Sequence, residues 1–227
     1  MAFLVQAYRS ERTSALITFS GGLDSAIALY WALDKKYLVE AVTFDYFHRS
    51  PRERDAAFLL AKLTRTHQYH VDVNFLREIE DLKMKGKNPN LLGAPGAYIS
   101  SRNMIFYGIA TSIAEIAGAR YIVGGHNKDD TNSFRDSSRE FFDQFNKTSA
   151  IGLHTGSKTG RVILPLSKMS KAQVVLLGDK LGVPFDLTWS CYGSGRHPCG
   201  KCHSCLLRTS AFKEAGILDP LVRERQR

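Results

Sequence analysis

The sequence lacks long hydrophobic runs, and it lacks cysteine outside one short segment. No apolar stretch approaches the roughly 18 residues that a membrane-spanning helix needs. The apolar residues 2–5 are too few for the hydrophobic part of a secretion signal. All four cysteines lie between residues 191 and 205, and a chain of this length needs no disulfides to build a core. These absences predict a cytoplasmic protein that does not enter a membrane.

The sequence also lacks both common glycine-rich nucleotide motifs, any internal repeat and any low-complexity tract. Neither the Walker motif G-x-x-x-x-G-K-[ST] nor the dinucleotide motif G-x-G-x-x-G occurs. With 227 residues, 44% of them hydrophobic and 23% charged, the chain has the composition of a globular domain and excludes a disordered or fibrous protein. Its net charge of +9 suits a polyanion, whether nucleic acid or the phosphates of a nucleotide, but it also suits an ordinary basic protein.

Short apolar runs alternate with helical patterns along the chain. Strands are predicted at residues 15–19, 38–44, 68–73, 121–123 and 162–164, and helices at 24–36, 101–118 and 170–181. Residues 83–96 are rich in Lys, Asn, Gly and Pro and predict an exposed loop. Strands that alternate with helices favour a parallel sheet covered on both faces. The predicted fold is therefore α/β, doubly wound around a mainly parallel five-stranded sheet.

A helix start is predicted where Ser50, Pro51 and Glu53 follow one another. Serine at the N-cap with glutamate three residues later forms a capping box, and proline is favoured at the first helical position. The spacing of Ala56, Leu59, Leu60 and Leu63 then predicts the buried stripe of this helix.

The strongest chemical signal stands where the first strand should meet the first helix: Ser20-Gly21-Gly22-Leu23-Asp24-Ser25. Glycines allow an anion to approach the backbone, and the N–H groups of a helix start hold phosphate oxygens. Ser20 and Ser25 add hydroxyl donors. Asp24 would repel phosphate, so it is expected to bind Mg²⁺ or to orient the loop. Aspartate and serine are also ordinary helix caps, so a purely structural turn remains the alternative.

The four cysteines follow the pattern C-x7-C-x2-C-x2-C. They are Cys191, Cys199, Cys202 and Cys205. In a reducing compartment such a cluster indicates a metal site. Four thiolates complete the tetrahedral shell of a structural Zn²⁺. An iron–sulfur cluster is the rival, since the last three cysteines also suit that ligation.

Several motifs carry a family resemblance. Residues 20–25 resemble the S-G-G-x-D-S pyrophosphate loop of the adenylating ATP pyrophosphatases. The chain from residue 188 resembles the ending of the 7-cyano-7-deazaguanine synthases. That resemblance implies an adenine nucleotide alpha hydrolase-like domain over residues 1–187, a zinc-binding segment over residues 188–227, and zinc rather than iron and sulfur. Other matching positions are Phe44-Asp45-Tyr46, Arg49, Arg102-Asn103, Phe134, Asp136, Glu140-Phe141, Pro165-Leu166 and Lys171-Ala172.

The resemblance implies an ATP-dependent carbon–nitrogen ligase. It would convert 7-carboxy-7-deazaguanine and ammonia to the nitrile, through an amide, by adenylating each oxygen in turn. The partners would be small molecules, and Mg²⁺ would accompany ATP. The reaction would require neither nucleic acid nor a membrane, and the protein could form a homodimer. The roles that it implies are catalysis for Asp24 and Lys171, ATP binding for Phe19, Ser20, Gly21, Gly22, Leu23, Asp24 and Ser25, substrate binding for Arg49, Arg102, Asn103 and Asp136, and metal binding for the four cysteines.

Alternatives stay open at this stage. Ser50, Ser100, Ser101 and Arg135 depart from the family pattern, so a relative that acts on another deazapurine or another acid is one. A tRNA sulfur transferase with the same loop is a second, although no cysteine pair lies outside the cluster. A zinc-containing nucleic-acid-binding module is a third, motivated by the basic C-terminus. Three of these residues also have purely structural interpretations. Arg102 could form a surface ion pair, Asp136 could cap a loop, and Lys171 could be a solvated helix lysine. His48 and His126 are candidate proton carriers, although a lone histidine is more often structural.

Overall fold

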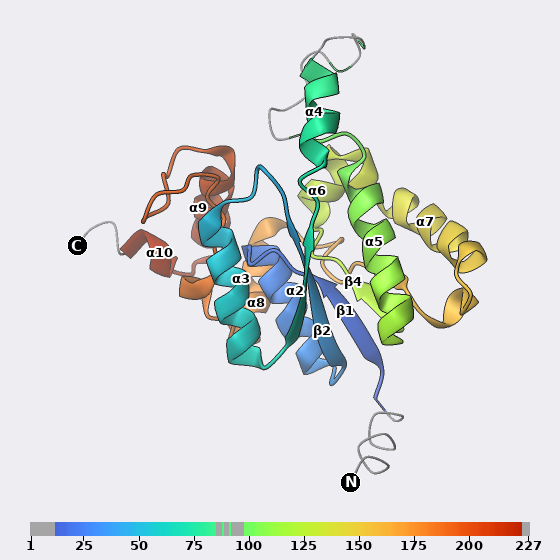
Figure 1. Cartoon of the computed structure of the whole chain (residues 1–227). Coiled ribbons are helices and arrows are strands. Elements are labelled where there is room, and N and C mark those ends of the chain that lie inside the picture. The colour runs from blue at the N-terminus through green and yellow to red at the C-terminus, as the bar shows by residue number, and fades with distance from the viewer. Residues whose placement is uncertain (1–11, 85–87, 89–90, 92–97, 224–227) are drawn as a thin grey trace.

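A five-stranded parallel sheet forms the centre of the computed structural model (Figure 1). The model describes the chain outside residues 1–11, 85–87, 89–90, 92–97 and 224–227. The strand order is β3-β2-β1-β4-β5, and each neighbouring pair is parallel. The prediction of a parallel five-stranded sheet is confirmed. The strands are β1 Ser14–Thr18, β2 Leu38–Asp45, β3 His67–Asp72, β4 Tyr121–Val123 and β5 Arg161–Ile163.

Helices cover both faces of the sheet, as a doubly wound fold requires (Figure 1). One face packs against α2 (Leu23–Asp34), α3 (Pro51–Thr64), α8 (Lys171–Lys180) and α9 (His203–Ala215). The other packs against α4 (Leu76–Met84), α5 (Arg102–Ala117) and α7 (Arg139–Gly152). The remaining elements are α6 Lys128–Ser133, α10 Pro220–Arg223 and the short 3-10 turns η2 Arg135–Ser137, η3 Gly156–Lys158 and η4 Phe185–Leu187.

Alternation along β1 divides the hydrophobic core in two. Ile17 packs on the side of α2 and α8, whereas Leu16 packs on the side of α5. Successive side chains of a strand point to opposite faces, and both residues are fully buried. This central strand therefore anchors both layers, and its carboxyl end leads directly into the glycine-rich loop.

The start of α3 differs from the prediction. Ser50 is the N-cap and Pro51 follows it, as predicted, but neither the Ser50 nor the Glu53 side chain caps the helix, so the predicted capping box is absent. The Ser50 hydroxyl instead donates to the Gly193 carbonyl, at 3.1 Å, and Glu53 lies against the glycine-rich loop. Tertiary contacts thus replace the local ones that the sequence pattern predicted.

The buried stripe of α3 also differs from the prediction. Leu59 and Leu63 are 46% and 57% exposed, while Ala56, Ala57, Leu60 and Ala61 are buried. The helix approaches its neighbours so closely that small side chains fill the contact.

Five helices of the described chain, α4, α6, α7, α9 and α10, were not predicted, and one predicted loop lies largely outside the described residues. Neither α4 nor α7 was expected from the sequence pattern, although both are amphipathic. The predicted loop at residues 83–96 falls mostly in the undescribed part of the chain. The C-terminal segment joins the main core, because α9 contributes the buried Ala211 and Phe212 to the cluster around α2 and α8. No helix in the described part of the chain is long and apolar enough to cross a membrane.

Candidate active site

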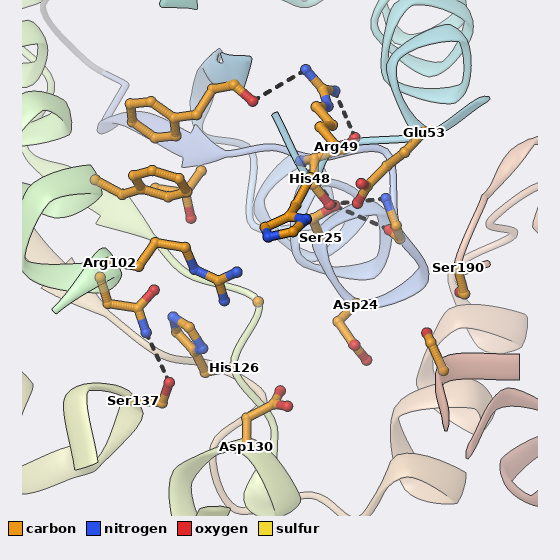
Figure 2. Close-up of a pocket in the computed structure, with 18 of the residues that line it drawn as sticks. Asp24, Ser25, His48, Arg49, Glu53, Arg102, His126, Asp130, Ser137 and Ser190 are labelled. Atoms are coloured by element: carbon orange, nitrogen blue, oxygen red, sulfur yellow. Dashed lines mark hydrogen bonds between the residues drawn. The ribbon is translucent and has the colours of Figure 1, made fainter. Parts of the chain in front are cut away.

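A cavity of about 620 Å³ opens at the carboxyl ends of the central strands (Figure 2). Ligands of open parallel α/β sheets bind at this edge, where the strand order reverses. The loops after β1, β2 and β4, the start of α5, and residues 189–192 of the C-terminal segment all line it. Segments far apart in sequence therefore meet around one chamber, large enough for a nucleotide and a small acid.

The glycine-rich loop holds its shape through its own serines. The Gly22 amide donates to the Ser20 hydroxyl at 3.1 Å, and the Ser25 hydroxyl donates to the Gly22 carbonyl at 3.0 Å. Gly22 is the N-cap of α2, and no side chain caps this helix. The N-terminal N–H groups of α2 are thus free of side-chain caps, and such groups together with the helix dipole attract phosphate.

Gly21 fits where no other residue would. Its φ is +90°, in the region that favours glycine, and a Cβ at this position would collide with the backbone of Glu53 and Ala57 in α3. The Gly21 carbonyl accepts a hydrogen bond of 3.0 Å from the Trp189 amide. The loop is therefore clamped between α3 and the C-terminal segment.

Arg49 lies under the loop with its guanidinium group in contact with protein atoms. One terminal nitrogen donates to the Asp45 carboxylate at 2.7 Å, and the other to the Ser20 carbonyl at 2.8 Å. Its side chain is only 1% exposed. These contacts tie the end of β2 to the glycine-rich loop, so Arg49 fixes the position of the loop.

Lys171 and Asp24 form an ion pair at the mouth of the loop. Burial lowers the pKa of Lys171, but the carboxylates of Asp24 and Asp130 outweigh it and raise the pKa overall. Burial, and then the charge of Asp24, raises the pKa of Asp130. The Oδ1 atom of Asp24 is buried without a hydrogen-bond partner. Two carboxylates with an unsatisfied oxygen fit the hard oxygen ligands that Mg²⁺ prefers.

Arg102 extends from the start of α5 into the cavity, beside His126 in Figure 2. Its guanidinium lies 5.9 Å from the Phe106 ring, and among the described residues no carboxylate forms an ion pair with it. An arginine in this state is suited to a carboxylate or a phosphate, which it can hold through two parallel hydrogen bonds.

Asn103 and Asp136 are hydrogen-bonded to each other at the wall of the cavity. The Asp136 carboxylate accepts from the Asn103 amide at 3.1 Å, and the Asn103 side chain donates to the Ser137 hydroxyl at 2.8 Å and to the Asp136 carbonyl at 3.1 Å. Both residues line the cavity. The pair joins η2 to the start of α5, next to Arg102.

Two further titratable groups face the cavity, His126 and Glu53. Burial, and then the charge of Arg102, lowers the pKa of His126 to about 4, so its imidazole is neutral at physiological pH. Burial also raises the pKa of Glu53, while the Ser20 hydroxyl and the guanidinium groups act in the opposite direction. A neutral histidine and a carboxyl with a raised pKa can accept protons in this chamber.

The four cysteines come together beside the cavity. All four Sγ atoms lie within 4.8 Å of one another, and those of Cys199 and Cys205 are 3.9 Å apart. A tetrahedral zinc with sulfur bonds of about 2.3 Å separates its sulfurs by about 3.8 Å. The Cys191 sulfur also accepts from the Gly193 and Cys199 amides at 3.2 and 3.3 Å. The cluster can therefore hold a metal ion.

Comparison with known proteins decides the family. A family model described as queuosine biosynthesis protein QueC matches residues 14–216. The chain belongs to this family. It is therefore an ATP-dependent enzyme of queuosine-type deazapurine biosynthesis, and the predicted family is confirmed.

Relatives named 7-cyano-7-deazaguanine synthase match over nearly their whole length. The protein of Thermoplasma acidophilum is 37% identical, over 95% of this chain and 94% of its own. The protein of Methanothermobacter thermautotrophicus is 35% identical, over 91% and 97%. That of Trichodesmium erythraeum is 33% identical, over 92% and 99%.

Solved structures share the fold of this QueC-family chain. NMN synthetase from Francisella tularensis has a TM-score of 0.54 at 18% identity, over 95% of this chain and 83% of its own. A 4-thiouridine synthetase, solved with RNA and bound ATP, has a TM-score of 0.51 at 23% identity, over 93% and 53%. At these identities the likeness concerns the fold alone, and it confirms the predicted α/β architecture.

The structure brings every residue of the predicted sites into two adjacent clusters, although it adds some that the sequence did not single out. Asp130 and Glu53 both line the cavity. The sequence pattern assigned Glu53 to a capping box, so its position in the cavity was not predicted. Asp130 lies in the polar run after the fourth predicted strand, and the carboxyl end of a parallel strand was the signal that could have found it.

Proposed function

We propose that this protein is a 7-cyano-7-deazaguanine synthase, which joins 7-carboxy-7-deazaguanine and ammonia at the expense of ATP. The single observation that carries this proposal is the juxtaposition of an uncapped, glycine-rich helix start with Arg102, whose guanidinium has no ion-pair partner among the described residues. One part suits a triphosphate and the other suits an acid. Relatives that carry this name match nearly the whole chain.

In the proposed reaction, the substrate carboxylate attacks the α-phosphorus of ATP. The bond to pyrophosphate breaks, and pyrophosphate remains on the amides of residues 20–25 while Lys171 compensates its charge. Arg102 orients the acid for this attack. Magnesium held by Asp24 and Asp130 would neutralise charge on the phosphates. Donors fixed in place before the reaction usually contribute most to catalysis of this type, because they stabilise the negative charge as it develops.

Ammonia then attacks the carbonyl carbon of the adenylate, and AMP leaves with the electron pair of the broken C–O bond. In a second round, the amide oxygen attacks the α-phosphorus of another ATP. The C–O bond to AMP then breaks with its electron pair on AMP, and loss of both N–H protons from the activated amide gives the nitrile. One chamber can serve both rounds, because each requires the same step, the attack of an oxygen on phosphorus.

The cysteine cluster is proposed to hold a structural Zn²⁺. Its donor set fits that ion, because four thiolates complete a closed tetrahedral shell with no position for substrate. Its position beside residues 189–192, which line the cavity, makes the cluster a support for the C-terminal wall. Residues 1–187 would then form the nucleotide-binding part and residues 188–227 the metal-binding part.

The test is incubation of the full chain with ATP, Mg²⁺, ammonium and 7-carboxy-7-deazaguanine, followed by mass spectrometry. The expected products are the amide and then the nitrile, with AMP and pyrophosphate. Omission of ammonium should leave acid-dependent exchange of labelled pyrophosphate into ATP. If no exchange occurs with this acid, or if another acid supports it instead, the proposed substrate is wrong.

A further inference from the structure

Glu53 occupies an unexpected place for an acidic side chain. It lies in the first turn of α3, and its Oε1 would be 3.4 Å from a Cβ built on Gly22, next to the Ser20 hydroxyl. This glycine belongs to the loop that receives an anion. A carboxylate there repels phosphate unless a cation lies between them.

Neither a helix cap nor an ion pair accounts for this glutamate, although the Ser20 hydroxyl forms a hydrogen bond with its carboxyl. Glu53 does not cap α3, and within the described residues no lysine or arginine forms an ion pair with it. Its carboxyl faces the cavity rather than the solvent (Figure 2). A partly desolvated carboxylate without a paired cation is costly, and such groups concentrate at functional sites.

We infer that Glu53 binds ammonium in the cavity and removes a proton from it, an inference that rests on the proposed function. Ammonium is the cation that the reaction itself consumes. It needs hydrogen-bond acceptors, which the Glu53 carboxylate offers, and it is also favoured by aromatic neighbours, since Tyr46 and Tyr192 line the same cavity. The acid held by Arg102 would then meet its nucleophile inside one chamber.

The step balances in protons and electrons. Ammonium gives one proton to the Glu53 carboxylate and becomes ammonia. The nitrogen lone pair forms the C–N bond, and the C–O bond to AMP breaks with its electron pair on AMP. A second proton leaves the nitrogen for water, and Glu53 returns its proton to water before the next turnover.

The charged and titratable groups around Glu53 set the pH at which it works. Arg49 and Arg102 favour the carboxylate, but burial outweighs them and raises its pKa. Tyr46 faces it from the loop after β2 and Tyr192 from the C-terminal segment, and burial raises the pKa of each phenol. Both phenols therefore stay neutral while Glu53 ionises, so that proton transfer from ammonium goes to the carboxylate.

The experiment compares Glu53→Gln and Glu53→Asp with the wild type in two separable assays. The first is acid-dependent pyrophosphate exchange without ammonium, and the second is amide formation as a function of ammonium and pH. We expect exchange within about threefold of the wild type in Glu53→Gln, but amide formation at subsaturating ammonium to fall about 10²-fold. Glu53→Asp should keep an intermediate rate with a shifted pH profile.

Hydroxylamine supplies the decisive control, because it is largely unprotonated at neutral pH and needs no base. Glu53→Gln should form the hydroxamate at a rate close to that of the wild type. Asp55→Asn removes an exposed carboxylate from the same helix and should change neither assay.

Three results would overturn the inference. One is an unchanged ammonium dependence in Glu53→Gln, and another is a failure of hydroxylamine to restore it. The third is a loss of exchange in both Glu53 variants, which would place the residue in nucleotide or magnesium binding. Absence of exchange in the wild type would instead refute the proposed function, so the two failures are distinguishable.

Discussion

Substitution of Gly21 by alanine should separate the glycine-rich loop from α3. Gly21 has a φ of +90°, and an added Cβ would collide with the backbone of Glu53 and Ala57. A left-handed conformation costs a non-glycine residue about 1–2 kcal/mol, and an overpacked contact costs about 1–3 kcal/mol more. We therefore expect Gly21→Ala to lower the free energy of unfolding by about 2–5 kcal/mol.

Gly118→Ala is the matched control. Gly118 has a φ of +69°, but nothing lies within 4 Å of a Cβ added there. This variant should lose only the conformational part, about 1–2 kcal/mol. Urea unfolding of both variants, with the slope checked to be unchanged, measures the difference.

Nucleotide binding gives the second readout. A shift of the backbone at residue 21 moves the amides that would hold pyrophosphate, so Gly21→Ala should weaken the binding of a non-hydrolysable ATP analogue by at least about tenfold, or about 1.4 kcal/mol. Gly118→Ala should bind it normally, as measured by calorimetry. Equal stability of the two variants, or normal ATP binding by Gly21→Ala, would refute the argument that α3 and the loop must approach this closely.

Three further predictions concern the ion pair of Lys171 with Asp24, the cysteines, and His126. Lys171→Met should reduce acid-dependent pyrophosphate exchange about 10²-fold, because it removes the cation paired with Asp24. The control Lys168→Met changes an exposed lysine and should leave the exchange rate unchanged. Equal exchange rates in the two variants would contradict the catalytic role of Lys171. Cys202→Ser should lower bound zinc below one equivalent, measured by atomic absorption, and reduce stability; a metal-replete, equally stable variant would disprove the structural role. Burial, and then Arg102, lowers the pKa of His126 from 6.5 to about 4, so the unfolded state binds more protons between these values, and stability present above pH 6.5 should fall by at most about 3 kcal/mol as the pH drops to 4. His126→Phe should flatten this part of the unfolding free energy against pH, and an unchanged slope would show that another group titrates.

Local rules explain how much of the fold was predictable from the sequence. All five strands and the position of the glycine-rich loop follow from apolar runs. The ends of α5 and α8 follow from the residues that end helices, such as Gly118 and Gly182. The helices α4, α6, α7, α9 and α10 were missed. In the same way, Leu59 and Leu63 matched the helical period but lie exposed, because the period does not say how closely a neighbour approaches.

The sequence by itself determined the chemistry of the two clusters. Residues 20–25 and the four cysteines are contiguous or nearly so, and the spacing within one segment already constrains where their backbone amides and sulfur atoms can lie. No distant contact was needed to predict a phosphate-binding loop or a thiolate metal site.

Only the tertiary structure decided the roles of side chains that reach across segments. Arg49 donates to the Ser20 carbonyl, and Asn103 donates to residues of η2. The Glu53 side chain does not cap α3 and lies against the glycine-rich loop instead. The packing of the helices on the sheet determines which partner such a side chain has. A buried polar group must form a hydrogen bond, so it pairs with the polar group that is nearest in space rather than nearest in sequence.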